Sequence, residues 1–259
     1  MKNRGKYGQA LHWGLAFVAA YLPTAHAGSF TVNPVRLTLS PSQTVAAVTV
    51  KNVGSESTVI QLETSSWTQH DGQDTLTSTN DILATPPILT SPPGGSHIVR
   101  VGLRRAPDPQ HEMTYRFFLR EVPPPEPIAQ GLRVALLISM PVFVVPPKAL
   151  VPAVQWRAVR AHDGNIRLLA KNTGQAHIQL GQLEITPAEG GPAIATRNMA
   201  DYLLPDNSRE WTVTPRSAAS IGEVLAISSQ ADIGLITAKV ALEDEPRELT
   251  PTTPATAAR

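Results

Sequence analysis

The sequence predicts an all-β protein made of two tandem immunoglobulin-like β-sandwich domains. Two observations favour this fold class. Short runs in which apolar and polar residues alternate recur along the chain, and a period of two is typical of β-strands. In addition, 24 prolines among 259 residues separate these runs and disfavour long helices. About 230 residues follow an apolar N-terminal segment, a length that suits two β-domains of ordinary size.

The first predicted domain covers residues 28–147 and contains about seven short strands. Most of them lie in the segments SFTVNPVRLTLS, TVAAVTVKNVG, TVIQLETSSWTQ, HIVRVGLRR, YRFFLREVP and LRVALLISMPVFVV. The segment PPILTSPPGG cannot form a helix, because proline lacks the amide N–H and restricts the residue before it. Seven strands in about 120 residues are typical of an immunoglobulin-like sandwich.

The second predicted domain covers residues 148–243 and repeats features of the first. Asp163-Gly164 predicts a hairpin turn between two apolar runs. Further strands are expected at 176–185, 210–214 and 235–242. The segment LLAKNTGQAHIQL is similar to VTVKNVGSESTVIQL in the first domain, which indicates an internal repeat. Residues 244–259 are polar and rich in Pro, Thr and Ala, and we expect a disordered tail there.

The N-terminus has the pattern of a secretory signal peptide over residues 1–27. Three basic residues precede an apolar run at 10–22, and Ala25-His26-Ala27 matches the small-x-small pattern before a cleavage site. The run is shorter than the roughly 20 residues of a membrane-spanning helix, although an uncleaved anchor is the alternative. We therefore expect a protein that is exported to the periplasm through a cleaved leader, without stable membrane insertion.

Charge and composition argue against several classes of function. Loss of the three basic leader residues changes the formal charge from +1 to −2, because 19 Lys and Arg then face 21 Asp and Glu. This balance argues against a protein that binds nucleic acid electrostatically. The chain contains no cysteine, which excludes disulfides, zinc–thiolate sites and a cysteine nucleophile.

Catalytic and metal-binding patterns are missing from the sequence. The seven histidines are scattered, and neither HExxH nor GxSxG nor a phosphate-binding loop occurs. We therefore predict no enzymatic activity, no metal and no cofactor. Four carboxylates could in principle form the pair that a secreted hydrolase needs, although acidic residues are common in turns. These are Asp71, Asp74, Asp81 and Glu121.

The segment 132–140 contains an unbroken alternation of large apolar residues. One face of the expected strand consists of Leu132, Val134, Leu136, Ile138 and Met140. Such a strand either belongs to the core of its own domain or is an edge strand that pairs with another protein. In the second interpretation, Ala135 and Leu137 on the opposite face would point to the domain's own core. The period of two supports both interpretations equally.

Many short segments together resemble the periplasmic pilus chaperones of the chaperone–usher pathway. In the first domain these are Pro34-Val35-Arg36, Val50–Gly54, Trp67, Ala84–Pro87, Pro93-Gly94, His97–Arg100, Tyr115-Arg116, Arg120–Pro123 and Pro141–Phe143. In the second they are Lys171–Gly174, Ala176-His177 and Tyr202–Pro205. Pro141–Phe143 and Ala176-His177 are similar to the archaic, or spore-coat-like, branch of the family.

The resemblance implies a chaperone that works by donor-strand complementation. Chaperones of this family bind pilus or fimbrial subunits, which lack their last strand, and deliver them to an outer-membrane usher. The chaperone inserts the last strand of its first domain, so that backbone hydrogen bonds and alternate side chains fill the subunit groove. The resemblance assigns this role to Leu132, Val134, Leu136, Ile138 and Met140. Burial of five such side chains would stabilise a complex by about 10 kcal/mol before ordering costs.

The resemblance also implies a basic site for the C-terminal carboxylate of the subunit, between the two domains. Arg36 matches the first of its two basic residues, and arginine can pair with a carboxylate through two hydrogen bonds. At the position of the second, a lysine in the better-known branch, this chain has Pro141. Either Arg100 or Arg116 replaces that lysine, or Arg36 acts alone.

Two other functions stay open from the sequence. One is a secreted structural or adhesive β-sandwich protein similar to a pilus subunit, which would be a single sandwich that lacks a strand. The other is the secreted hydrolase with paired carboxylates in a cleft.

Overall fold

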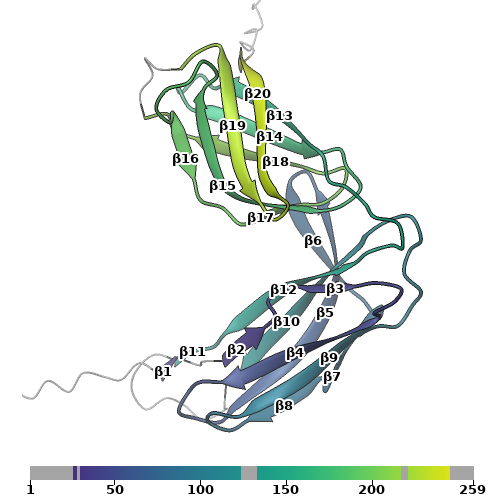
Figure 1. Ribbon diagram of the computed structural model, residues 1–259. Coiled ribbons are helices and arrows are strands. Elements are labelled where there is room, and N and C mark those ends of the chain that lie inside the picture. Colours follow the sequence, from purple (N-terminus) through teal and green to yellow (C-terminus); the bar gives the residue numbers. More distant parts are fainter. Residues whose placement is uncertain (1–25, 28–29, 124–132, 217–220, 246–259) are drawn as a thin grey trace, which may run out of the picture.

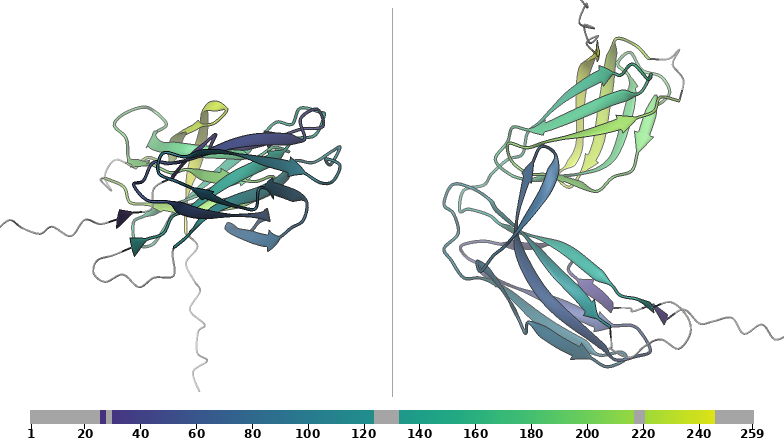
Figure 2. Two further views of the ribbon diagram at one scale, coloured as in Figure 1. Left: turned by 90° about the horizontal axis from the view of Figure 1, so that it is seen from below. Right: turned by 180° about the vertical axis from the view of Figure 1, so that it is seen from behind.

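The computed structural model describes residues 26–27, 30–123, 133–216 and 221–245. These residues form strands and connecting loops arranged as two β-sandwiches that lie at an angle to each other (Figures 1 and 2). The all-β fold predicted from the sequence is therefore confirmed. Residues 1–25, which contain most of the predicted leader, and residues 246–259 of the predicted tail lie outside the described part.

The first sandwich consists of one six-stranded and one four-stranded sheet. In the six-stranded sheet the order is β3-β12-β10-β5-β6, with β8 also paired to β5. Its strands are β3 (Leu37–Leu39), β5 (Thr58–His70), β6 (Gln73–Ser78), β8 (Ile88–Ser91), β10 (Met113–Val122) and β12 (Leu137–Val144). The second sheet has the order β2-β4-β9-β7, with β2 (Phe30–Asn33), β4 (Val45–Asn52), β7 (Ile82–Thr85) and β9 (Ser96–Leu103).

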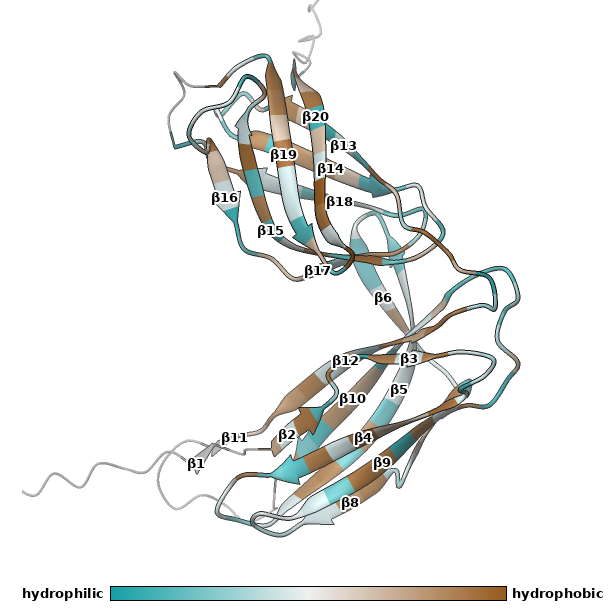
Figure 3. Ribbon diagram, in the orientation of Figure 1, coloured by the Kyte–Doolittle hydropathy of each residue, from teal (hydrophilic) through white to brown (hydrophobic). Residues whose placement is uncertain are grey.

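Alternating residues of the two sheets form the core between them. In β10, Tyr115, Phe117 and Leu119 are buried, and they pack in one cluster with Val48 and Val50 of β4. Figure 3 shows how hydrophobic residues recur along these strands. This pattern is what a sheet with one buried face requires.

The second sandwich is built from eight strands in the order β16-β15-β19-β20-β13-β14-β18, with β17 paired to β15. They are β13 (Val154–Arg160), β14 (Ile166–Asn172), β15 (Ile178–Pro187), β16 (Ala195–Arg197), β17 (Asp201–Leu203), β18 (Ser208–Val213), β19 (Val224–Ala231) and β20 (Gly234–Asp244). Strand β20 joins the two layers, because it pairs with β19 along most of its length and with β13 at its end. Glu245 continues this edge by donating to the carbonyl of Arg160, so the ordered domain extends two residues beyond the predicted end at 243.

The internal repeat has a structural counterpart in two buried asparagines. The Nδ2 atom of Asn52 donates to the carbonyls of Glu56 and Ser91, at 2.7 and 2.9 Å. In the second domain, the Nδ2 atom of Asn172 donates to the carbonyls of Ala176 and Leu203, at 2.7 and 3.0 Å. In both cases Oδ1 accepts the amide of the glycine two residues later, at 2.9 Å. The same residue thus ties a turn to a neighbouring strand in each sandwich.

Candidate functional site

The two sandwiches meet at a small aromatic cluster. Trp67 of β5, Phe143 of β12 and Leu204 are buried together, with Tyr202 of β17 packed against them. The Trp67 and Tyr202 rings meet edge to face with centroids 5.5 Å apart. The His177 ring lies parallel to Phe143 at a centroid distance of 3.4 Å. This apolar contact fixes the position at which polar side chains from both domains converge.

The hairpin of β5 and β6 extends beyond the first sandwich and reaches the second (Figures 1 and 2). Strand β6 is exposed along its whole length, but the side chain of Gln69 on β5 is buried. Gln69 donates to the carbonyl of Tyr202 at 2.9 Å and accepts the amide of Leu204 at 2.9 Å. This side chain therefore pairs with the second domain much as a neighbouring strand would.

Ion pairs surround the same junction. The Asp74 carboxylate of β6 accepts Nη2 of Arg209 at 3.0 Å. Across the junction, Nδ1 of His177 lies 2.8 Å from the carboxylate of Glu112, whose side chain is only 2% exposed. Nη1 of Arg36 lies 2.7 Å from Oδ2 of Asp232, in the turn between β19 and β20. Each of these three contacts joins one domain to the other.

Arg116 lies next to Pro141, the position at which the resemblance implied a lysine. In the pairing of β10 with β12, Arg116 stands directly opposite Pro141. Its guanidinium carbon lies 3.8 Å above the centre of the Trp67 ring. Its Nη2 atom lies 3.8 Å from the carboxylate of Asp74. Burial lowers the pKa of this guanidinium, whereas Asp74 opposes the shift.

Arg36 and Arg116 approach the same tyrosine. The guanidinium of Arg116 is 5.7 Å from the Tyr202 ring. Burial raises the pKa of the Tyr202 phenol, and the adjacent Arg36 guanidinium acts in the opposite direction. The structure thus brings two of the three predicted arginines to one site. Their side chains are 41% and 16% exposed, respectively, so that an anionic group can approach Arg36 from solvent.

The third predicted arginine, Arg100, lies elsewhere. It is an exposed residue of β9 in the four-stranded sheet, paired across with Ala47 and Thr85. Among the residues that the structure describes, no hydrogen bond, ion pair or ring contact links it to Arg36, Arg116 or Tyr202. Arg116 is therefore the better candidate of the two that the sequence proposes.

The predicted apolar strand is interrupted in the structure. It forms β11 (Arg133–Val134) and β12, with Ala135 and Leu136 between them outside either strand. Leu132 lies outside the described residues. Strand β11 pairs in parallel with β1 (His26–Ala27), the last two residues of the predicted leader.

The exposure of the alternating row rises towards its N-terminal end. Met140 is 1% exposed and belongs to the core of its own domain. Ile138 and Leu136 are partly buried and pack against that core, whereas Val134 is 46% exposed. The prediction that Met140 faces a partner is therefore wrong, because its side chain already fills the core.

The inward orientation of the opposite face, which was expected only for a donated strand, is also wrong. Leu137 is 50% exposed and Ala135 is exposed, so neither points into the domain's own core. The row from Val134 to Met140 is a single face that starts in solvent and ends in the core. The sequence pattern could not separate these cases, because it contains no information on where the sandwich ends.

The four carboxylates considered for a hydrolase lie in separate structural contacts. Asp74 pairs with Arg209, Asp81 accepts the hydroxyl of Tyr115, and Glu121 accepts the amide of Leu136. Asp71 lies in the turn between β5 and β6 with a positive φ of 49°. These carboxylates give the hydrolase interpretation no support.

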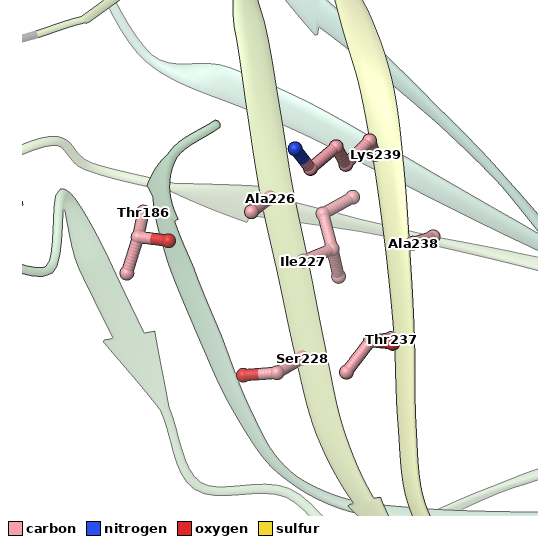
Figure 4. A pocket seen from close by; sticks show the side chains of 7 residues that line it. All are labelled: Thr186, Ala226, Ile227, Ser228, Thr237, Ala238 and Lys239. Atoms are coloured by element: carbon pink, nitrogen blue, oxygen red, sulfur yellow. The ribbon is translucent and has the colours of Figure 1, made fainter. Parts of the chain in front are cut away.

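Other surface features lie apart from the junction. A shallow pocket of about 290 Å³ opens on β15, β19 and β20, lined by residues that include Ser228, Thr237 and Lys239 (Figure 4). Within the described residues, no group of three or more potential metal ligands is found. No helix in the described part of the chain is long and apolar enough to span a membrane.

Sequence reasoning missed the polar residues that join the domains. Gln69, Glu112 and Asp232 have partners more than 50 positions away in the chain. His177 and Tyr202 were noticed only as part of the family resemblance. The charged residues Glu112 and Asp232 resemble ordinary loop residues in the sequence, so no local pattern could have identified them.

The comparisons with known proteins agree with this architecture. Residues 29–150 match the model of a family described as pili and flagellar-assembly chaperones, PapD N-terminal domain. This match over the first domain confirms the resemblance that the sequence predicted. A search of curated protein sequences gives no significant match.

Solved structures with the same fold cover nearly the whole described chain. One is the CsuC–CsuE chaperone–tip adhesion subunit pre-assembly complex from archaic chaperone–usher Csu pili of Acinetobacter baumannii. It matches with a TM-score of 0.61 and 18% identity over 84% of this chain and 100% of the other. The E. coli chaperone DraB matches with a TM-score of 0.56 and 20% identity, over 85% and 98% of the two chains. The Salmonella enterica SafA pilin in complex with the SafB chaperone matches with a TM-score of 0.58 and 15% identity, over 84% of this chain and 100% of the other.

Proposed function

We propose that the protein is a periplasmic chaperone that binds pilus subunits by donor-strand complementation and passes them to an outer-membrane usher. One observation supports this most directly. The apolar row of β11 and β12 is continuous with the core at Met140 but half exposed at Val134. An apolar strand end beyond its own core is a template for pairing with another chain. Similarity to the CsuC–CsuE complex favours the archaic branch.

The donor segment consists of Val134, Leu136 and Ile138, together with Leu132. Full burial of a large aliphatic side chain stabilises a complex by about 1.5–3 kcal/mol. In the structure the backbone of β11 is paired with His26–Ala27. Cleavage after Ala27 would remove that partner and free this edge for a subunit. Export and activation of the chaperone would thus follow from the same cut.

The carboxylate site consists of Arg36 and Arg116 at the domain junction. In the structure Asp232 already pairs with Arg36, so a carboxylate is a chemically suitable partner there. The C-terminal carboxylate of a subunit would share or replace this contact. Pro141 on β12 carries no charge. Because Arg116 of β10 lies directly opposite Pro141, it supplies a positive charge beside that position.

Capture of a subunit tests the proposal. Pilus subunits from the same organism are co-expressed with the chain in a bacterial periplasm and recovered through a tag on the chaperone. We expect Val134→Glu to reduce recovery at least tenfold, since a buried, unpaired charge costs several kcal/mol. Val134 is a better site than Leu136, which packs partly against the chaperone's own core.

Leu137→Glu is the matched control. It introduces the same charge on the same strand at a side chain that is 50% exposed, but on the opposite face. Recovery should stay near the wild-type level. Equal recovery with Val134→Glu and wild type would contradict the donor-strand assignment.

The alternative of a structural or adhesive protein similar to a pilus subunit is not favoured. A subunit would be a single sandwich with a missing strand. This chain has two sandwiches, and the first has β12 in place between β3 and β10.

A further inference from the structure

The donor strand leaves its own sheet at a defined point. The register between β10 and β12 runs from Met113 opposite Val144 to Arg120 opposite Leu137. At the next position the amide of Glu121 still donates to the carbonyl of Leu136, at 2.9 Å. The return bond is different, because the amide of Leu136 donates to the carboxylate Oε2 of Glu121 at 3.0 Å. Beyond it the chain continues as β11, which pairs with β1 instead.

Glu121 is held for this role by its neighbours. It follows Tyr115, Phe117 and Leu119 on the core-facing side of β10, so its carboxylate lies at the end of the apolar row. The hydroxyl of Thr58 on β5 donates to Oε1 at 3.2 Å. Each of the two oxygens thus accepts a hydrogen bond, one from Thr58 of β5 and the other from Leu136 just before β12. Hydrogen bonds to a charged acceptor are stronger than those between neutral groups.

A side-chain acceptor at this point ends the ladder. In a regular antiparallel pair, the amide of Leu136 would donate to the backbone carbonyl opposite, and pairing could continue. The carboxylate takes that amide, and a charged group at the end of the core row also disfavours closure of the sandwich around it. Together with Pro123, which has no amide to donate to the residue opposite, this leaves residues 133–135 for another strand.

We propose that Glu121 is a positioning residue that ends the pairing of β10 with the donor strand, and so sets how much of this strand is available to a subunit. The effect of Glu121 on a bound subunit rests on the proposed function. Its effect on the pairing of β10 concerns the free chain alone and is tested separately.

The free chain is tested by amide hydrogen exchange on protein purified from the periplasm. In Glu121→Val the row of apolar side chains on β10 continues. The Leu136 amide loses the carboxylate, and its remaining acceptor is the backbone carbonyl of residue 121. We expect exchange at residue 134 to slow at least tenfold as the ladder extends, whereas the amide of residue 136 exchanges one hydrogen bond for another. Glu121→Gln keeps a side-chain oxygen acceptor and should retain the wild-type pattern. Glu63→Gln removes an exposed carboxylate from the same sheet and should change neither amide.

Two results would overturn the inference in the free chain. One is unchanged exchange at residue 134 in Glu121→Val. The other is faster exchange at residues 134 and 136, which would show that the carboxylate holds the strand rather than ends its pairing. Neither result depends on whether the chain captures a subunit, so a failure here is distinct from a failure of the proposed function.

The complex is tested through the register of the captured strand. Because the chain has no cysteine, Val134→Cys gives a single thiol that can form a disulfide with cysteines placed along the subunit groove. A shift of two residues moves the strand by about 7 Å, which is outside disulfide range. We expect Glu121→Gln to keep the wild-type cross-linking partner. Glu121→Val should lose that partner or reduce the cross-linked yield at least tenfold. Wild-type partner and yield in Glu121→Val would contradict the positioning role.

Discussion

At the scale of single residues, buried polar side chains hold this fold together where loops meet strands. Asn52 and Asn172 are buried and share three equivalent hydrogen bonds to backbone groups, and Asn172 also accepts the amide of Ala153 at 3.3 Å. Buried backbone groups without partners are costly, so such side chains have little freedom to vary. The three shared bonds also explain why the KNxG pattern occurs once in each domain.

Asn172→Ala should lower the free energy of unfolding of the second domain by about 3 kcal/mol, because it leaves the carbonyls of Ala176 and Leu203 and the amide of Gly174 without this partner. Urea unfolding followed by fluorescence measures the change. The neighbouring exposed residue provides a control, since Lys171→Ala should change the midpoint little. Similar midpoints for both variants would show that Asn172 does not contribute to the stability of the second domain.

Tyr115 predicts a loss of stability at alkaline pH. Its hydroxyl donates to Asp81 at 3.0 Å, and burial, followed by this hydrogen bond, raises the pKa of the phenol. The native state therefore keeps the proton at a pH where the unfolded state, with a pKa of about 10, loses it. The contribution of Tyr115 to the free energy of unfolding is fully present below about pH 10, and it is lost as the pH rises above that value.

Tyr115→Phe should lose about 1 kcal/mol at pH 8 through the missing hydrogen bond, and should then show a shallower decline above pH 10 than wild type. Urea midpoints between pH 8 and 11 measure both effects. Parallel curves for the two proteins would mean that Tyr115 titrates in the same way in the folded and unfolded states.

At the scale of elements, two strands extend beyond the sandwich to which they belong. The β5–β6 hairpin reaches the second domain through Gln69, and β6 itself is hydrophilic along most of its length (Figure 3). The proposed donor strand extends from the opposite end of the six-stranded sheet. One extension contacts the second domain, and in the proposed function the other pairs with a subunit.

Gln69→Leu keeps the size of the buried side chain but leaves the Tyr202 carbonyl and the Leu204 amide without their partner. We expect a loss of about 2 kcal/mol in stability and a wider range of angles between the domains. Calorimetry and small-angle X-ray scattering measure these effects. Gln73→Leu on the exposed strand β6 is the control, and indistinguishable scattering from all three proteins would contradict the role of Gln69.

At the scale of the whole molecule, the junction between the domains both fixes their angle and brings the two arginines together. Arg36 reaches it from the segment before β3, and Arg116 from the middle of β10. The partner groups Asp232 and Tyr202 come from the second domain. The proposed carboxylate site therefore requires that both domains are correctly placed.

Arg36→Ala should reduce subunit recovery about tenfold or more, because a charged hydrogen bond to a carboxylate contributes about 1.5–3 kcal/mol. Arg116→Lys keeps the charge but loses the planar stacking on Trp67, and we expect a smaller reduction. Co-purification measures both variants. Arg100→Ala on the other sheet serves as the control, and a loss of recovery with this variant alone would reverse the assignment.

Much of the fold could be predicted from the sequence, because alternating runs mark strands with one buried face. The runs around Val48, Ile60, Phe117 and Leu168 all form such strands. Strand β6 was missed because it has no buried face, and β19 because Ser228 and Ser229 interrupt its apolar residues. The family resemblance was confirmed for the first domain.

The candidate site could be predicted only in part. Arg36 and Arg116 were identified, but the sequence could not choose between Arg116 and Arg100, since that choice depends on which strand lies opposite Pro141. Met140 was misplaced because periodicity does not show where a core ends. The contacts of Gln69 and Glu121 link distant strands and have no local pattern.

The most direct test of the account is hydrogen exchange of the donor strand with and without a captured subunit. Donor-strand complementation predicts that amides at residues 133–135 become strongly protected in the complex, while those at 142–144, already paired with β10, change little. Unchanged exchange at 133–135 in a purified complex would show that the subunit is held elsewhere.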